Sequence, residues 1–183
     1  MTNVFILNGA PTAGKDTFCE MVIKHGKSHG LTVKTISSVD EVKRLATEMG
    51  WSGAKEDKDR DFLAELKYLW KRYNNGPLKD MLSKCKKLDY DILFVHIRET
   101  DEIEELKQLL QSSVHEVTFD RIYCWSMYLN RNVASVTSNA ADAQAMTSEG
   151  YDYDIILDNN GTLEDLEHAA IAFLQSGENL ASQ

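Results

Sequence analysis

A glycine-bearing loop after the first apolar run constrains the fold more than any other feature of the chain. Four apolar residues, Val4-Phe5-Ile6-Leu7, lead into Gly9-Ala10-Pro11-Thr12-Ala13-Gly14-Lys15-Asp16-Thr17, and apolar residues recur at helical spacing after it. This order is typical of a strand, a loop and a helix. The backbone N–H groups of such a loop and the helix N-terminus surround a polyphosphate, and the lysine adds a mobile positive charge. The sequence therefore predicts a phosphate-binding loop, with an ordinary glycine-rich turn as the alternative.

The residue after the lysine departs from the usual signature of this loop. A Ser or Thr normally stands there to coordinate Mg²⁺, whereas this chain has Asp16, with Thr17 one place later. A carboxylate is also a hard oxygen ligand, so we expect Asp16 to hold Mg²⁺ directly or through its waters. Thr17 is then available for the α-phosphate. The alternative is that the departure weakens the metal site.

The Gly-Lys-Asp-Thr form of the loop resembles that of the phage-type deoxynucleoside monophosphate kinases. Its Gly-Lys-Asp part is similar to the loop of animal-type phosphomevalonate kinases, and both groups belong to the nucleoside monophosphate kinase-like P-loop folds. Three further segments resemble parts of small P-loop kinases from phages and bacteria: Ser37 to Lys43, Lys58 to Lys67, and His96-Ile97-Arg98-Glu99. The resemblance implies ATP and Mg²⁺ as cofactors. It also implies an Asp-x-Arg strand ending, where this chain has His96 for the Asp and matches the Arg with Arg98.

Apolar runs alternate with amphipathic segments along the chain, which predicts an α/β, three-layer P-loop fold with a mainly parallel sheet of about five strands. The expected strands are 4–7, 31–37, 91–97, 114–119 and 153–157. The expected helices follow the loop and then cover 38–49, 57–74, 78–88, 102–111 and 162–175, the second opened by a Ser38 and Glu41 capping box and the last capped by Thr162. One domain covers 1–183, with a helical acceptor-binding insertion at 38–88 and a lid-like segment at 121–148.

Ligands of such sheets bind beyond the carboxyl ends of the strands, which selects further candidate residues. Arg98 is the expected ligand of the acceptor phosphate. If the acceptor is a hydroxyl, Asp40 or Glu99 is the candidate general base. The remaining candidates are Ser38, Arg60 and Lys67 for the acceptor, and Arg121 and Arg131, which flank the segment where related kinases carry a lid over ATP. For Arg60 and Arg131 a solvated surface charge is an equal alternative.

Composition narrows the class of partner. A net charge of −9 and a pI near 5.0 disfavour non-specific nucleic-acid binding, because that binding relies on many Lys and Arg contacts. The three cysteines are odd in number and contain no C-x-x-C pair, which argues for a reducing compartment, so we expect a cytoplasmic protein. No apolar run is long enough to span a membrane. A monomer and a homodimer both remain open.

These features together favour an ATP-dependent phosphotransferase that converts a nucleoside or deoxynucleoside monophosphate to the diphosphate. Such transfer requires aligned phosphates and neutralised charge more than covalent chemistry from the protein. The alternatives are a P-loop kinase acting on a hydroxyl of a small molecule or modified base, and a non-catalytic nucleotide-binding module.

Overall fold

The computed structural model describes residues 2–54, 56–87, 89–112, 122–132 and 148–180. Its elements in chain order are β1 (Thr2–Asn8), α1 (Lys15–Ser28), β2 (Val33–Ser37), α2 (Asp40–Glu48), α3 (Asp57–Asn74), α4 (Gly76–Cys85), β3 (Ile92–His96), α5 (Thr100–Ser112), β4 (Ile122–Asn130), β5 (Ile155–Asp158) and α7 (Leu163–Leu180). They form two compact units. One comprises Met1–Thr35 with Leu88–Gln183, and the other is Ile36–Lys87.

The five strands form one sheet in the order β2-β3-β1-β4-β5. β1 pairs in parallel with β3 on one side and with β4 on the other, and β4 pairs in parallel with β5. Leu7, near the carboxyl end of β1, stands level with His96 of β3 and Met127 of β4. The loop that follows β1 therefore begins between the carboxyl ends of two neighbouring strands.

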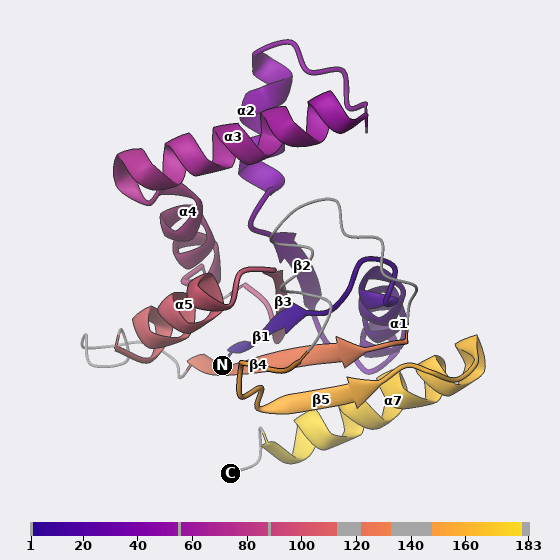
Figure 1. The fold of residues 1–183 in the computed structure, drawn as a ribbon. Coiled ribbons are helices and arrows are strands. Elements are labelled where there is room, and N and C mark those ends of the chain that lie inside the picture. The colour runs from indigo at the N-terminus through magenta and orange to yellow at the C-terminus, as the bar shows by residue number, and fades with distance from the viewer. Residues whose placement is uncertain (1, 55, 88, 113–121, 133–147, 181–183) are drawn as a thin grey trace. The chain divides into compact units, whose positions relative to one another are not determined.

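Helices cover both faces of this sheet, as Figure 1 shows: α1 and α7 lie on one side and α5 on the other. Because side chains alternate along a strand, the unbroken apolar run of β1 supplies residues to both layers. The buried cluster on the α1 and α7 side comprises Phe5, Leu7, Phe18, Cys19, Val22, Ile92, Phe94, Met127, Leu129, Leu166, Ala170 and Leu174. The predicted three-layer α/β class is confirmed.

A carboxylate joins α5, β4 and the start of β5. Oδ2 of Asp154 accepts hydrogen bonds from the backbone N–H of Ser126 at 2.6 Å, from its hydroxyl at 2.8 Å and from Nζ of Lys107 at 2.5 Å. Ser126 is fully buried. Burial favours the neutral acid, but these donors outweigh it and hold the pKa of Asp154 below its ordinary value.

The unit Ile36–Lys87 contains α2, α3 and α4. Nε1 of Trp51 donates to Oδ1 of the buried Asp59 at 3.1 Å. At the turn between α3 and α4, a Cβ added to Gly76 would stand 1.8 Å from Nε1 of Trp70, so only glycine fits there. Asn75 takes the left-handed conformation at this turn, with φ of 56°.

Several local predictions are confirmed and others are wrong. The bounds 57–74 agree with α3, and Thr162 caps α7 through reciprocal bonds with Asp165. The expected Ser38 capping box is wrong, because α2 has no side-chain cap at its N-cap residue and the carboxylate of Asp40 instead accepts from the N–H of Ser37. The helical spacing of Phe62, Leu66, Leu69 and Tyr73 predicts one apolar face of α3, but Leu69 and Tyr73 are exposed.

The second half of the sheet differs from expectation. β4 occupies Ile122–Asn130, where the sequence suggested the beginning of a lid-like segment rather than a strand. The strand expected at 114–119 lies outside the described residues, as does 133–147 of the proposed lid. Within the described ranges, no helix combines the length and the apolar character needed to cross a membrane.

Candidate functional site

The loop after β1 has a backbone that requires glycine at two positions. Gly9 has φ of 144° and Gly14, the N-cap of α1, has φ of 94°. A Cβ on Gly9 would stand 2.5 Å from the carbonyl oxygen of Leu129, and one on Gly14 would stand 2.5 Å from Nδ2 of Asn159. Glycine is therefore required at both positions for two reasons: the backbone has positive φ, and a side chain would collide with a neighbouring group.

Two buried asparagines anchor this loop, and neither was among the predicted site residues. Asn8 accepts from the N–H of Gly9 at 2.7 Å, and its Nδ2 donates to the hydroxyl of Tyr153 at 2.8 Å and to the carbonyl of Arg98 at 3.2 Å. Asn8 is fully buried, and burial raises the pKa of Tyr153 to about 12, which keeps that phenol neutral. Asn8 thus ties the loop to the segment that follows β3.

Asn159 anchors the other end of the loop from the turn after β5. Its Nδ2 donates to the carbonyl of Ala13 at 2.7 Å, and its backbone N–H donates to the carbonyl of Asn130 at 2.7 Å. Only 4% of Asn159 is exposed. The sequence offered little reason to select Asn159, because Asn is a common turn residue and 158–162 is a turn between a strand and a helix. The one signal of a site residue was its position just after the carboxyl end of a parallel strand.

Lys15 opens α1 and folds back over the loop. Its Nζ donates to the carbonyl of Gly9 at 2.5 Å and to that of Ala10 at 2.7 Å. A hollow of about 200 Å³ is lined by Thr12, Ala13, Gly14, Lys15, Asp16 and Thr17. The ammonium therefore lies beside a concave set of loop residues at a helix N-terminus, which is the arrangement that binds phosphate oxygens.

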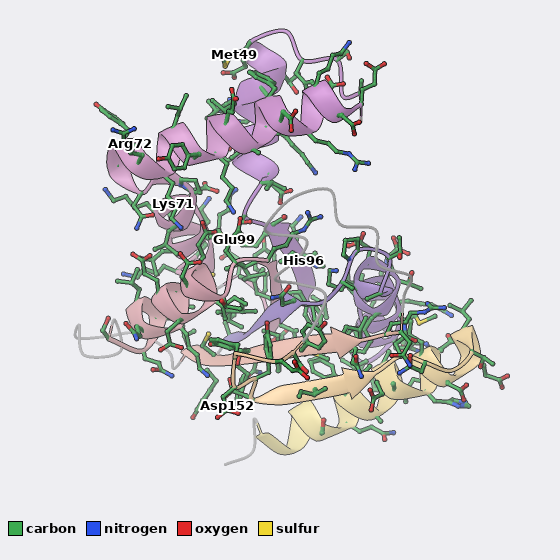
Figure 2. All side chains as sticks on the ribbon, viewed as in Figure 1. Met49, Lys71, Arg72, His96, Glu99 and Asp152 are labelled. Carbon is green, nitrogen blue, oxygen red and sulfur yellow. The ribbon has the colours of Figure 1, made fainter. Side chains whose placement is uncertain are left out.

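Asp16 and His96 form the second charged feature of the site. The Asp16 carboxylate is 92% exposed, and its Oδ1 lies 3.9 Å from Nδ1 of His96. The His96 side chain is only 13% exposed, and its Nε2 lies 3.7 Å from Sγ of Cys19. Burial raises the pKa of Cys19 to about 12, so the thiol stays protonated at neutral pH. Figure 2 shows His96 at the end of β3, with Glu99 on the segment that leads on to α5.

Three other predicted residues of this unit follow strand ends. Arg98 is exposed and Glu99 is half-buried, and both lie in the segment between β3 and α5. The backbone carbonyl of Glu99 also accepts from Ile103 at 3.1 Å as α5 begins. Arg131 is exposed and follows β4, while Arg121 lies outside the described residues.

The remaining predicted residues belong to the unit Ile36–Lys87. Asp40 lies at the first position of α2, where its carboxylate accepts from the N–H of Ser37 at 2.7 Å. Ser38 and Lys67 are buried, and Arg60 is exposed. Their roles toward an acceptor stay predictions.

No family model matches the chain, and no curated protein matches it. Solved structures do match. APS kinase CysC from Mycobacterium tuberculosis, in complex with AMPPNP and APS, has a TM-score of 0.59 over 95% of this chain and 98% of its own. This chain shares its fold with that kinase. The Cys556Ala mutant of the same enzyme has a TM-score of 0.55, covering 95% of this chain and 97% of its own. The protein APE1195 has a TM-score of 0.56, covering 96% of this chain and 95% of its own.

Sequence identity to these three structures is 12 to 13%, so the likeness is one of fold. It supports the predicted P-loop kinase architecture over nearly the full length of the chain. The narrower resemblance to phage-type deoxynucleoside monophosphate kinases stays a prediction.

Proposed function

We propose that this protein is an ATP-dependent phosphotransferase whose acceptor is a nucleoside or deoxynucleoside monophosphate. The observation that carries the proposal is the loop itself. Its two glycines have backbones that disfavour other residues, buried amides hold both of its ends, and Lys15 lies against it. A site that is held this firmly at a helix N-terminus suits repeated binding of a polyphosphate.

The chain's residues divide the work of transfer by position. The loop N–H groups and Lys15 bind the β- and γ-phosphates, and Thr17 reaches the α-phosphate from the first turn of α1. Arg98 binds the acceptor phosphate from the end of β3. When bound, Mg²⁺ neutralises charge on the phosphates, and the exposed carboxylate of Asp16 at the edge of the hollow suits it as a hard oxygen ligand.

The reaction then needs no general base from the protein. An anionic oxygen of the acceptor phosphate attacks the γ-phosphorus in line, the bond from that phosphorus to the bridging oxygen breaks, and ADP leaves. The contribution of the chain is alignment and neutralisation of charge, which lower the barrier through positioned donors rather than covalent chemistry.

A hydroxyl acceptor is the second candidate, and the position of Glu99 favours it. This half-buried carboxylate directly follows Arg98 at the carboxyl end of β3, where a general base for a hydroxyl would be needed. Asp40 is the other candidate base, and its carboxylate accepts a hydrogen bond from the N–H of Ser37 at the start of α2.

The test is ATP consumption by the purified chain with Mg²⁺ across a panel of ribo- and deoxynucleoside monophosphates. Lys15→Ala serves as the blank, and Lys27→Ala, an exposed lysine farther along α1, is the matched control. We expect turnover with one or a few monophosphates in the wild type and the control, and at least about a hundredfold less in Lys15→Ala, as for the loss of an essential charge-stabilising group.

Product analysis by ³¹P NMR separates the acceptor classes. A new diphosphate resonance supports the main proposal, whereas a new monoester resonance supports the hydroxyl acceptor and should depend on Glu99. Tight, Lys15-dependent binding of ATP without turnover on any acceptor would identify a nucleotide-binding module and contradict the phosphotransferase.

A further inference from the structure

The last two turns of α3 carry an exposed aromatic and cationic surface, which we name the α3 surface: Tyr68, Leu69, Arg72 and Tyr73. We propose that the α3 surface binds single-stranded nucleic acid, with the two tyrosine rings stacking on bases and Arg72 contacting a phosphate. This inference goes beyond the phosphotransferase and does not depend on it.

The four side chains share one face of the helix. Residues four apart are neighbours on a helix, which places Tyr68 beside Arg72 and Leu69 beside Tyr73. Tyr68 is 60% exposed, Leu69 59% and Tyr73 84%, and Arg72 is exposed as well. Figure 2 shows Arg72 on the C-terminal part of α3. Large apolar side chains that are exposed together, and not singly, generally mark a binding surface.

The charge of this region is opposite to that of the whole chain. The unit Ile36–Lys87 contains 12 of the 20 Lys and Arg residues but only 9 of the 29 Asp and Glu residues, so it carries a net charge of +3. The rest of the chain carries −12. Exposed charges more than about 10 Å apart are largely screened from each other by salt, so the overall charge of −9 does not exclude a polyanion on the α3 surface.

The sequence around the α3 surface has no acidic residue. Positions 66–79 contain Lys67, Lys71, Arg72 and Lys79 and no Asp or Glu. This composition favours an anionic partner. It disfavours a second copy of the same face, because the identical positive charges of two such faces would repel each other.

Exposed rings beside a guanidinium favour a nucleic acid over an acidic peptide. Every base has a π-face that stacks on an aromatic side chain, whereas Asp and Glu side chains have none. Residues four apart on a helix have Cβ atoms about 5–6 Å apart, so Tyr68 and Arg72 suit the base and the phosphate of one nucleotide. The bases of a duplex already stack on one another, so a single strand is the form that fits.

Fluorescence anisotropy of a labelled oligothymidylate of about 12 nucleotides tests the rings on the full chain at low salt. We expect binding by the wild type and roughly tenfold weaker affinity in Tyr73→Ala, which is the scale of one lost base stack. Tyr73→Phe keeps the ring and should bind as the wild type does. Because Tyr73 is 84% exposed, neither substitution should unfold the chain. Equal affinity in Tyr73→Ala and the wild type would overturn the stacking.

The salt dependence of the same binding tests Arg72 separately. Each phosphate contact with a single strand adds about 0.7 to the magnitude of the slope of log K against log salt concentration. Arg72→Gln should therefore reduce that magnitude by about 0.7, whereas Arg72→Lys should not. Lys27→Gln, which changes an exposed lysine of α1, is the matched control and should keep the wild-type slope. A wild-type slope in Arg72→Gln would contradict the phosphate contact.

Competition and a loop variant identify the partner and the place of binding. The inference is overturned if dTMP at the same nucleotide concentration displaces the oligonucleotide, or if a duplex binds as tightly as the single strand. It is also overturned if no binding is seen at protein concentrations up to about 100 μM, the weak end of non-specific binding. Loss of binding in Lys15→Ala would overturn it as well, because the oligonucleotide would then occupy the phosphate-binding loop.

The outcomes separate this inference from the proposed function. Oligonucleotide binding without turnover of any acceptor supports the α3 surface and contradicts the phosphotransferase. Lys15-dependent turnover without oligonucleotide binding does the reverse.

Discussion

Gly9→Ala should lower the free energy of unfolding by about 3 kcal/mol, which is the combined result of two structural costs. The φ of 144° at Gly9 is a conformation that costs other residues about 1–3 kcal/mol. The new Cβ would also lie 2.5 Å from the carbonyl oxygen of Leu129, so β1 and β4 must shift, and overpacking of this kind costs a further 1–3 kcal/mol or so. The melting temperature of a chain of this length should fall by about 6–12 °C.

Gly30→Ala is the matched control for this experiment. Gly30 also has positive φ, at 75°, but an added Cβ meets nothing within 4 Å, so its cost should be only about 1–2 kcal/mol of backbone strain. Urea unfolding followed by circular dichroism measures both free energies. The reasoning about the close approach of Gly9 to β4 is refuted if the two variants lose the same stability.

Three further predictions concern buried polar groups and thiols. Asn159→Ala removes the hydrogen bond to the carbonyl of Ala13 and should lower the free energy of unfolding by about 1–3 kcal/mol. It should also weaken AMPPNP binding in a fluorescence titration, and unchanged binding would contradict the role of Asn159 as an anchor of the loop. The hydrogen bonds that Asp154 accepts, from Lys107 among others, outweigh burial and lower its pKa, so the ionised carboxylate stabilises the fold above the ordinary pKa of 3.8. This stabilisation is lost as pH falls through the lower pKa of the folded state. In Asp154→Asn the free energy of unfolding should therefore depend less on pH between about pH 5 and 2, and a slope equal to that of the wild type would contradict this. A thiol reagent at pH 8 should modify the half-buried Cys124 before the two buried cysteines, whose pKa values are about 12, and mass spectrometry that finds another cysteine modified first would reject this order.

The parts of the fold that depend on residues close together in the sequence were predictable from it. The loop, the strand before it and the helix after it follow one another within 28 residues, and the full length of α3 follows from its periodicity. β4 was missed because Ile122–Asn130 mixes polar and aromatic residues, and what makes it a strand is its pairing with β1. Local periodicity contains no information about that partner.

The candidate site was predictable to a smaller extent, for the same reason. Lys15 and Asp16 carry a local motif, whereas Asn8 and Asn159 gain their roles from contacts with residues up to 146 positions away. For His96 the sequence shows only that an imidazole replaces the expected carboxylate. Its distance from Asp16 results from the register of β1 with β3, which no single segment specifies.

The central position of β1 has a consequence for synthesis of the protein on the ribosome. The loop and its lysine precede β3 and β4, the two strands that flank β1, and Asn159 follows all of them in the chain. A nascent chain therefore carries the nucleotide motif long before it has the anchors that shape it. We expect capture of nucleotide to begin only after the segment that contains Asn159 has been translated, so that chains terminated before it neither sequester ATP nor gain stability from it.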